Sequence, residues 1–122
     1  MLINLTNHPS VFWCIEQLHV ATQKWGSVCD FPFPIVPASI ETSEVQELAI
    51  QTAERVLEMH PDAILCQGEM TLCFALVRIF QQKNIPVLAA TSAREVVEIV
   101  LPDGSTQKNV MFHFVRFREY TI

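Results

Sequence analysis

Apolar and polar residues alternate along the chain in blocks whose lengths fit strands and helices in turn. Four short apolar runs, at 2–5, 28–31, 63–66 and 86–90, have the length of buried strands. Helical spacing of apolar residues follows the first three runs, at about 10–24, 42–59 and 71–83. This alternation predicts an α/β fold, with a Rossmann-like parallel sheet and helices on both of its faces.

The ends and faces of the helices follow from capping residues and spacing. Ser10 is a good N-cap for the first helix, and Gly26 marks its end. Along that helix, one face is shared by Val11, Ile15, Leu18 and Thr22. Thr42 or Ser43 is expected to cap the second helix, whose buried stripe is formed by Val45, Leu48, Ala49, Ala53, Val56 and Leu57.

The last third of the chain departs from this alternation. Residues 95–101 and 107–117 are rich in branched and aromatic side chains, and the turn residues 102–105 lie between them. We therefore expect a C-terminal β-hairpin that extends or edges the sheet. Strict alternation along its second strand places on one face Phe112, Phe114, Arg116 and Arg118, and on the other Met111, His113, Val115 and Phe117.

Composition narrows the function without changing the fold. The 122 residues make a single domain, 1–122, with half of them apolar and only 17% charged, which excludes intrinsic disorder. So few charges leave part of the surface for a subunit interface, and a homo-oligomer is expected. The net charge of −5 argues against binding to duplex nucleic acid, which needs a broad cationic surface, but permits a small anionic ligand in one pocket.

Several familiar sites are missing from the sequence. The three glycines allow neither a dinucleotide-binding G-x-G-x-x-G loop nor a Walker A loop, and no cofactor is expected. The histidines predict no metal site, because His19, His60 and His113 are separated in the sequence and fall in segments of different pattern. The four cysteines are too scattered for a disulfide framework, so buried reduced thiols are expected. Without a basic leader or about 18 consecutive apolar residues, the chain is expected to be cytoplasmic and free of membrane contact.

Three polar segments carry the strongest functional signal in the residues themselves. They follow the first, third and fourth predicted strands, at 6–10, 67–71 and 91–94, and ligands of open α/β sheets gather at such carboxyl ends. Each segment precedes or approaches a helix start, where free N–H groups can receive a phosphate. The candidate ligand-binding residues are Thr6, Asn7, Ser10, Gln67, Gly68, Met70, Thr71, Thr91, Ser92 and Arg94. The alternative is that these residues only cap helices and close turns.

Three residues of these segments have specific interpretations. His8 directly follows the first strand and could transfer a proton or bond to a ligand, or could be a turn residue bonded to backbone. Glu69 either stabilises a helix start through the helix dipole, or orients a ribose hydroxyl or accepts a proton. Gly68 allows a close backbone approach, either to another loop or to a ligand.

Two arginines near the C-terminus extend the aromatic row of the hairpin. Arg116 and Arg118 could hold phosphates and stack on bases. They could equally guard an exposed sheet edge against aggregation, paired with Glu119. Both interpretations stay open from the residues alone.

Three motifs in combination resemble a known family. They are Leu2-Ile3-Asn4-Leu5-Thr6-Asn7-His8-Pro9-Ser10, Cys66-Gln67-Gly68-Glu69-Met70-Thr71 and Val115-Arg116-Phe117-Arg118-Glu119-Tyr120. Over residues 1 to about 120, the chain resembles the small stand-alone CRISPR-associated ring nucleases found beside type III systems, which are related in fold to CARF domains. The resemblance implies a CARF-like homodimer that binds cyclic tetra-adenylate, the second messenger of those systems, and cuts it to switch the antiviral response off.

The resemblance also implies how the site works. Segments 6–10 and 67–71 stand where CARF domains place ligand-binding loops, and the two-fold axis of a dimer suits a cyclic ligand. Cleavage needs no metal, because a ribose 2′-hydroxyl can attack the neighbouring phosphate and leave a 2′,3′-cyclic phosphate and a 5′-hydroxyl. The implied catalytic residues are His8, Glu69 and Arg118, with Arg116 as a ligand of phosphate.

Other functions stay open at this point. The chain could bind the same messenger without cutting it, as a sponge or sensor, and the ring could hold four or six adenylates. A flavodoxin-like mononucleotide-binding domain or a purely structural dimer is a further possibility. Flavin binding would colour the protein yellow, and a structural dimer would gain no thermal stability from a cyclic oligoadenylate.

Overall fold

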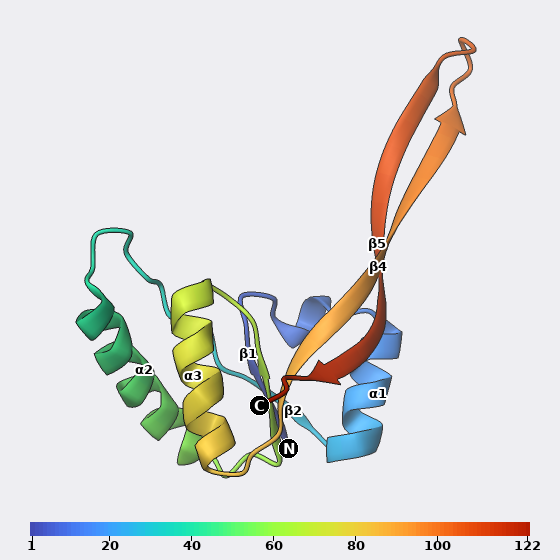
Figure 1. The fold of residues 1–122 in the computed structure, drawn as a ribbon. Helices are drawn as coiled ribbons and strands as arrows, with labels where there is room; N and C mark the ends of the chain where they lie inside the picture. Colours follow the sequence, from blue (N-terminus) through green and yellow to red (C-terminus); the bar gives the residue numbers. More distant parts are fainter.

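Short strands and amphipathic helices alternate along the first 90 residues, as the sequence pattern predicts. The computed structural model describes residues 1–122 (Figure 1). Its elements are β1 (Leu2–Leu5), the short 3₁₀ helix η1 (Ser10–Phe12), α1 (Ile15–Trp25), β2 (Val28–Asp30), α2 (Thr42–Leu57), β3 (Ala63–Cys66), α3 (Met70–Gln82), β4 (Val87–Val100) and β5 (Thr106–Glu119). The predicted α/β fold and the C-terminal hairpin are confirmed.

The five strands form one sheet in the order β2-β1-β3-β4-β5. The first four run parallel, with Leu2 of β1 opposite both Val28 of β2 and Ala63 of β3, and β5 runs antiparallel to β4. The chain moves outward from β1 in both directions, so the strand order reverses between β1 and β3. In open α/β sheets, a crevice for ligands forms outside the carboxyl ends of the strands at such a reversal.

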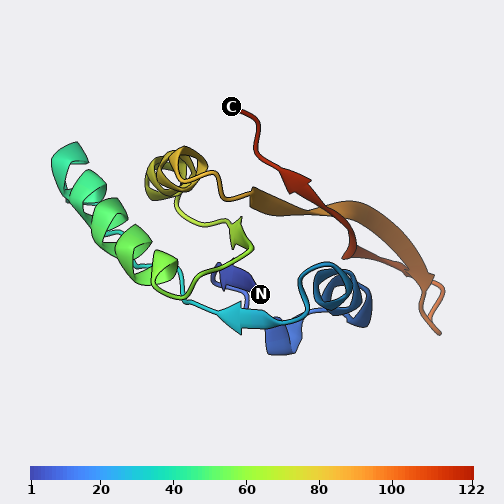
Figure 2. The same ribbon diagram turned by 90° about the horizontal axis from the view of Figure 1, so that it is seen from below.

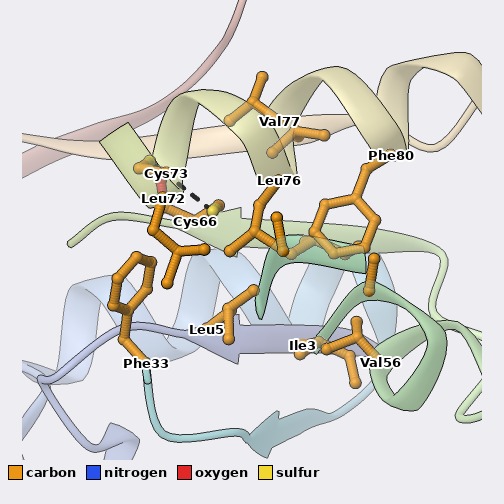
Figure 3. Close-up of a cluster of buried hydrophobic side chains, with 14 residues drawn as sticks. Ile3, Leu5, Phe33, Val56, Cys66, Leu72, Cys73, Leu76, Val77 and Phe80 are labelled. Atoms are coloured by element: carbon orange, nitrogen blue, oxygen red, sulfur yellow. Dashed lines mark hydrogen bonds between the residues drawn. The ribbon is translucent and has the colours of Figure 1, made fainter. Parts of the chain in front are cut away.

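Helices cover both faces of the sheet. Figure 2 shows α2 and α3 on one side and α1 on the other. Alternate strand residues point to opposite faces, so Ile3 and Leu5 join the larger core with α2 and α3, whereas Leu2 joins the smaller core with α1. Figure 3 shows side chains of the larger core, from β1, β3, α2 and α3. No helix combines the length and the apolar character that crossing a bilayer requires.

The hairpin is longer than the sequence pattern predicts. Thr91–Arg94, expected as a polar loop, continues β4, because each of these residues pairs with β5: Ser92 faces Phe114 and Arg94 faces Phe112. β3 accompanies β4 only as far as Leu88, so β5 is the only strand that pairs with the rest of β4. The two strands project together beyond the sheet (Figure 1).

A β-bulge changes which residues of β5 share a face. Thr91 pairs with Arg116 and Ser92 with Phe114, which leaves Val115 as the extra residue. The ring of Phe114 consequently packs against that of Phe117 in a tilted arrangement, with 5.0 Å between the ring centroids, although the two are three residues apart. The predicted common face of Phe114 with Arg116 and Arg118 is therefore wrong, because strict alternation does not hold across the bulge.

The start and the faces of α1 also differ from the prediction. Ser10 begins η1, and Cys14 is the N-cap of α1, accepting a hydrogen bond from the Gln17 N–H. The expected apolar face is exposed at Val11, Ile15 and Leu18, while the buried residues of α1 are Gln17 and Ala21. The extended backbone at Trp13 and Cys14 removes Val11 from the helix, and α1 turns the face of Gln17 and Ala21 toward the smaller core instead of the face of Ile15 and Leu18.

Helix α2 keeps its predicted stripe but not its predicted cap. Ala49, Ala53 and Val56 are buried, and Val45, Leu48 and Leu57 pack against the larger core. Glu41, rather than Thr42 or Ser43, is the N-cap, and it forms a reciprocal capping box with Glu44. The four cysteines are free thiols, but only Cys66 and Cys73 are buried, whereas Cys14 is exposed and Cys29 half-buried.

Candidate functional site

A pocket of about 650 Å³ opens at the carboxyl edge of the sheet, beside the reversal of strand order. It lies on the α1 side and has a volume typical of small-molecule sites. Residues of all three predicted segments line it: Thr6, Asn7, His8, Gln67, Gly68 and Ser92. The remaining lining residues are Phe12, Trp13, Cys14, Gln17, Leu65, Ala90, Phe112 and Phe114. The structure thus brings together six of the residues that the sequence singled out.

A buried network fixes the loop after β1. The Asn4 side chain, 1% exposed, donates from Nδ2 to the His8 carbonyl at 2.9 Å and to Asp30 Oδ1 at 2.8 Å. The Thr6 hydroxyl donates to Asn4 Oδ1 at 2.8 Å, and Trp13 Nε1 donates to the His8 carbonyl at 3.1 Å. Two part-buried donors, from Asn4 and Trp13, thus hold the carbonyl of His8.

The His8 side chain is free of this network. Its backbone N–H donates to Thr6 Oγ1 at 3.1 Å, but its imidazole makes no hydrogen bond within the chain and is exposed at the pocket. The turn interpretation therefore accounts for the His8 backbone only. An unbonded imidazole at the pocket is available to exchange a proton or a hydrogen bond with a ligand.

The helix start at Ser10, where the sequence predicted that a phosphate could bind, is already occupied by a side chain of the protein. The Asp30 carboxylate accepts from the Ser10 N–H at 3.1 Å and from the Ser10 hydroxyl at 3.0 Å. Ser10 accordingly closes the loop onto the end of β2 and does not line the pocket. Asp30 was not among the candidates from sequence, although a carboxylate at the end of an otherwise apolar strand was a signal of such a role.

Gln67 and Gly68 shape the pocket through packing rather than through free polar groups. The Ala90 N–H donates to Gln67 Oε1 at 2.9 Å, and Gln67 Nε2 donates to the Ala90 carbonyl at 3.4 Å. This pairing ties the loop after β3 to β4. A Cβ on Gly68 would lie 2.5 Å from the Phe33 ring, so the close approach that the sequence predicted is to another loop.

Glu69 caps α3. Its carboxylate accepts from the Thr71 hydroxyl at 2.6 Å and from the N–H groups of Thr71 and Leu72 at 3.1 and 2.8 Å. The hydrogen bond from the Thr71 hydroxyl, followed by those from the two N–H groups, lowers the pKa of Glu69. A lower pKa makes the carboxylate a weaker base, and its presence at the α3 N-terminus leaves less room for a phosphate there.

Glu69, Met70 and Thr71 face another hollow. They line a groove of about 1010 Å³ between α2 and α3, together with Phe74 and Arg78. None of these five residues contributes to the lining of the carboxyl-edge pocket. The segment 67–71 is therefore divided, with its first two residues in the pocket and its last three outside it.

The arginines lie outside the pocket lining. Phe117 packs against Trp13 and Trp25 on the α1 side, so its neighbours Arg116 and Arg118 point to the α3 side of β5. Neither forms an ion pair, with Glu119 or with any other carboxylate. The Thr91 hydroxyl bonds to the Arg116 carbonyl at 3.0 Å, which holds the bulge.

Arg94 is placed differently from these two arginines. It lies two residues beyond Ser92 on the same face of β4, so it stands above the pocket mouth, exposed and without an ion pair. No lysine or arginine is among the residues that line the pocket itself.

Aromatic side chains make up the apolar wall of the pocket. The sequence placed Phe112 and Phe114 in an aromatic row but not in the site, and it assigned Phe12 and Trp13 to a continuous helix; all four line the pocket. Trp13 reaches the site because it ends η1 and inserts into the smaller core. Its proximity to the His-Pro-Ser turn was the signal available in the sequence.

Tyr120, the last residue of the third motif, has a structural position. Its hydroxyl donates to the Cys66 carbonyl at 2.8 Å and lies 3.7 Å from Cys73 Sγ, which anchors the end of the chain against β3. Burial, followed by its hydrogen bond with Cys73, raises the pKa of Tyr120. No three histidine, cysteine or acidic side chains of the chain gather in a way that could hold a metal ion.

Comparison with known proteins gives a family for the whole domain. A family model described as the uncharacterized protein MJ1673 family matches residues 1–118. The chain belongs to this family. No curated protein and no solved structure matches the chain. The family description names no activity, so a function for this MJ1673-family chain has to be argued from the site.

Proposed function

We propose that this MJ1673-family chain is a metal-independent ring nuclease that binds cyclic tetra-adenylate as a homodimer and opens the ring. The observation that carries the proposal is the carboxyl-edge pocket, which combines an unbonded imidazole on a fixed backbone with an aromatic wall. The three motifs that resemble CRISPR-associated ring nucleases supply the substrate class. By the same resemblance, the reaction switches off type III signalling.

The pocket suits adenine bases. Phe12, Phe112 and Phe114 offer ring faces on which unpaired bases stack, a contact worth about 1–3 kcal/mol per base. Apolar contact of this kind also lets an acidic protein with a net charge of −5 bind an anionic ligand in one place without a broad cationic surface.

The reaction is an internal transfer of a phosphodiester bond. The 2′-oxygen of one ribose attacks the adjacent phosphorus, the bond from phosphorus to the 5′-oxygen breaks, and a 2′,3′-cyclic phosphate and a 5′-hydroxyl result. One proton leaves the 2′-hydroxyl and one joins the 5′-oxygen, so no other reactant is consumed. His8 carries one of these proton transfers, and holding the ring against the aromatic wall sets the attacking oxygen in line.

Arg94 is the cation of the same chain best placed to balance phosphate charge, because it continues the strand face of Ser92 above the pocket. Arg116 and Arg118 can act on a ligand only if it extends over the sheet edge to the α3 side. Glu69 is assigned to the cap of α3, since its oxygens already accept three hydrogen bonds. We therefore expect its substitution to alter stability more than chemistry.

The test is cleavage of cyclic tetra-adenylate in excess EDTA, with products identified by liquid chromatography and mass spectrometry. Linear products with a 2′,3′-cyclic phosphate are expected from the wild type. His8→Ala should lower the cleavage rate by about 100-fold or more, in the range typical of a removed acid–base group. His19→Ala is the matched control, because His19 is exposed on α1 away from the pocket. Equal rates for wild type and His8→Ala would contradict the role of His8.

Binding without cleavage is the second candidate, and one observation favours it. The pocket lining contains no lysine or arginine, which are the usual stabilisers of charge on a phosphate in the transition state. A sponge or sensor would retain the ring intact, and denaturing the complex would return it unchanged. Recovery of intact ring at one ring per dimer, with no linear product, would support this function and exclude the nuclease.

A further inference from the structure

The long hairpin exposes apolar side chains that nothing in the chain covers. Beyond the bulge, the arm, which we define as residues 92–114, carries exposed Val96, Val110 and Phe112 on one face. Beside its base, exposed Val11, Phe12 and Ile15 form what we call the shoulder, at η1 and the start of α1. Ile15 is 87% exposed and Val11 80%.

Arm and shoulder form one continuous surface. Phe112 of the arm and Phe12 of the shoulder both line the carboxyl-edge pocket, so the pocket mouth lies between them. Val96 and Val110 face each other across the two strands on the side that bears Phe112. Six such side chains, each exposing on the order of 100 Å², approach the ~800 Å² that one partner buries in a standard protein interface.

An uncovered arm of this kind is not stable by itself. A two-stranded hairpin without a third strand or a packed helix is marginal in water. From Ser92 to Val100 the arm extends ~27 Å at about 3.4 Å per residue, far enough to cross onto another molecule. Figure 1 shows that no other element of the same chain accompanies it.

The shoulder has the same apolar character as the arm. The arm holds two basic and three acidic residues, so most of the chain's net charge of −5 falls outside it and no strong charge on the arm opposes an apolar contact. Lys108 lies on the same arm face as Val110, opposite Glu98 of β4, and Glu16 follows Ile15 in the first turn of α1. The shoulder of a second copy is therefore a matching partner for the arm, because the two exposed surfaces are alike in apolar character and together reach the size of an interface.

We propose that the arm of one copy lies against the shoulder of a second copy, and the reverse, about a two-fold axis. Such a contact is isologous, because each copy contributes the same two surfaces. The partner's arm then covers the mouth of the pocket. The amine of Lys108 on that arm supplies a cation for phosphate, which the lining of a single copy lacks. This last step rests on the proposed function, whereas the contact itself does not.

Sedimentation of the ligand-free protein over a concentration series tests the contact. The wild type should sediment as a dimer of twice 13.9 kDa. Val110→Asp on the arm and Ile15→Asp on the shoulder should each raise the dimer dissociation constant on the order of 100-fold or more, because each places an unpaired charge in the contact. Both positions are exposed, so circular dichroism should show an unchanged fold.

Ile35→Asp is the matched control. Ile35 is a 90% exposed apolar residue between β2 and α2, distant from arm and shoulder in the chain, and its substitution should leave the dimer intact. A monomeric wild type would overturn the proposal. Loss of the dimer with Val110→Asp but not with Ile15→Asp would also overturn it, because it would mean that arm pairs with arm.

A mixing experiment tests whether Lys108 acts across the contact. His8→Ala and Lys108→Gln should each cleave cyclic tetra-adenylate poorly alone. When they are mixed and allowed to exchange, half of the dimers hold one copy of each, and one pocket in each of those dimers combines an intact His8 with an intact Lys108. About a quarter of wild-type activity should return. If mixing restores nothing while each dimer forms, or if Lys108→Gln is fully active, the role of Lys108 is overturned and the dimer contact stands.

Discussion

Single polar residues hold the candidate site together, and their hydrogen bonds explain which candidates are free to act. Asn4, Asp30 and Ser10 bond to one another or to the loop backbone, whereas the His8 imidazole has no partner. Sequence reasoning found the loop because polar residues follow an apolar strand. It could not tell bonded from unbonded side chains, since Asn4 and Asp30 meet only when β1 and β2 pair.

Gly68 is the residue at which packing can be tested most directly. In Gly68→Ala, the new methyl group would overlap the Phe33 ring, and we expect the free energy of unfolding to fall by about 1–3 kcal/mol. Urea denaturation measures the change. Adding Phe33→Leu to the same protein should recover part of the loss, because the smaller side chain gives way, and a double variant less stable than either single one would contradict this explanation.

Glu69 gives the protein a pH-dependent contribution to stability. Its carboxyl pKa is lowered from 4.5 in the folded state, chiefly by the hydrogen bond from the Thr71 hydroxyl. A carboxyl group whose pKa is lowered by folding stabilises the folded protein at pH values above its unfolded-state pKa. This contribution is lost as the pH falls through the folded-state pKa. We therefore expect Glu69→Gln to melt at a lower temperature than the wild type at neutral pH, with a difference that shrinks below about pH 4.5. A difference independent of pH would show that the cap does not act through charge.

At the scale of elements, the bulge in β5 determines what surrounds the pocket. It sets Phe114 and Phe117 on one side, where Phe117 meets Trp13 and Trp25 at ring distances of 6.1 and 5.6 Å. Phe117→Ala should lower the free energy of unfolding by about 2–3 kcal/mol and change the tryptophan fluorescence. Phe74→Ala, at a 66% exposed position of α3, is the control and should leave both unchanged.

The same elements show where sequence patterns stop being informative. The pattern identified β1, β3, α2 and α3 because each has one consistent period and clear ends. It could not show that Thr91–Arg94 is strand, because these polar residues are held by pairing with a distant segment. It also continued α1 back to Ser10, because the extended backbone at Trp13 is set by tertiary packing and not by local preference.

For the molecule as a whole, the topology follows from the alternation of strands and helices, and with it the edge where a ligand is expected. The strand order β2-β1-β3-β4-β5 places the loops after β1 and β3 side by side at the reversal of strand order. The separation of the arginines from the pocket was beyond sequence analysis, since one bulged residue, Val115, decides their side. The exposed arm was likewise visible only as a hairpin, not as a projection (Figure 1).

The central claim is that the pocket opens a cyclic oligoadenylate, and one measurement addresses it most directly. Purified protein is incubated in EDTA with a large molar excess of cyclic tetra-adenylate, and intact and linear species are quantified by mass spectrometry. The account predicts that each protein molecule converts many rings to linear products that end in a 2′,3′-cyclic phosphate. Ring that stays intact under these conditions, whether bound or unbound, would contradict it.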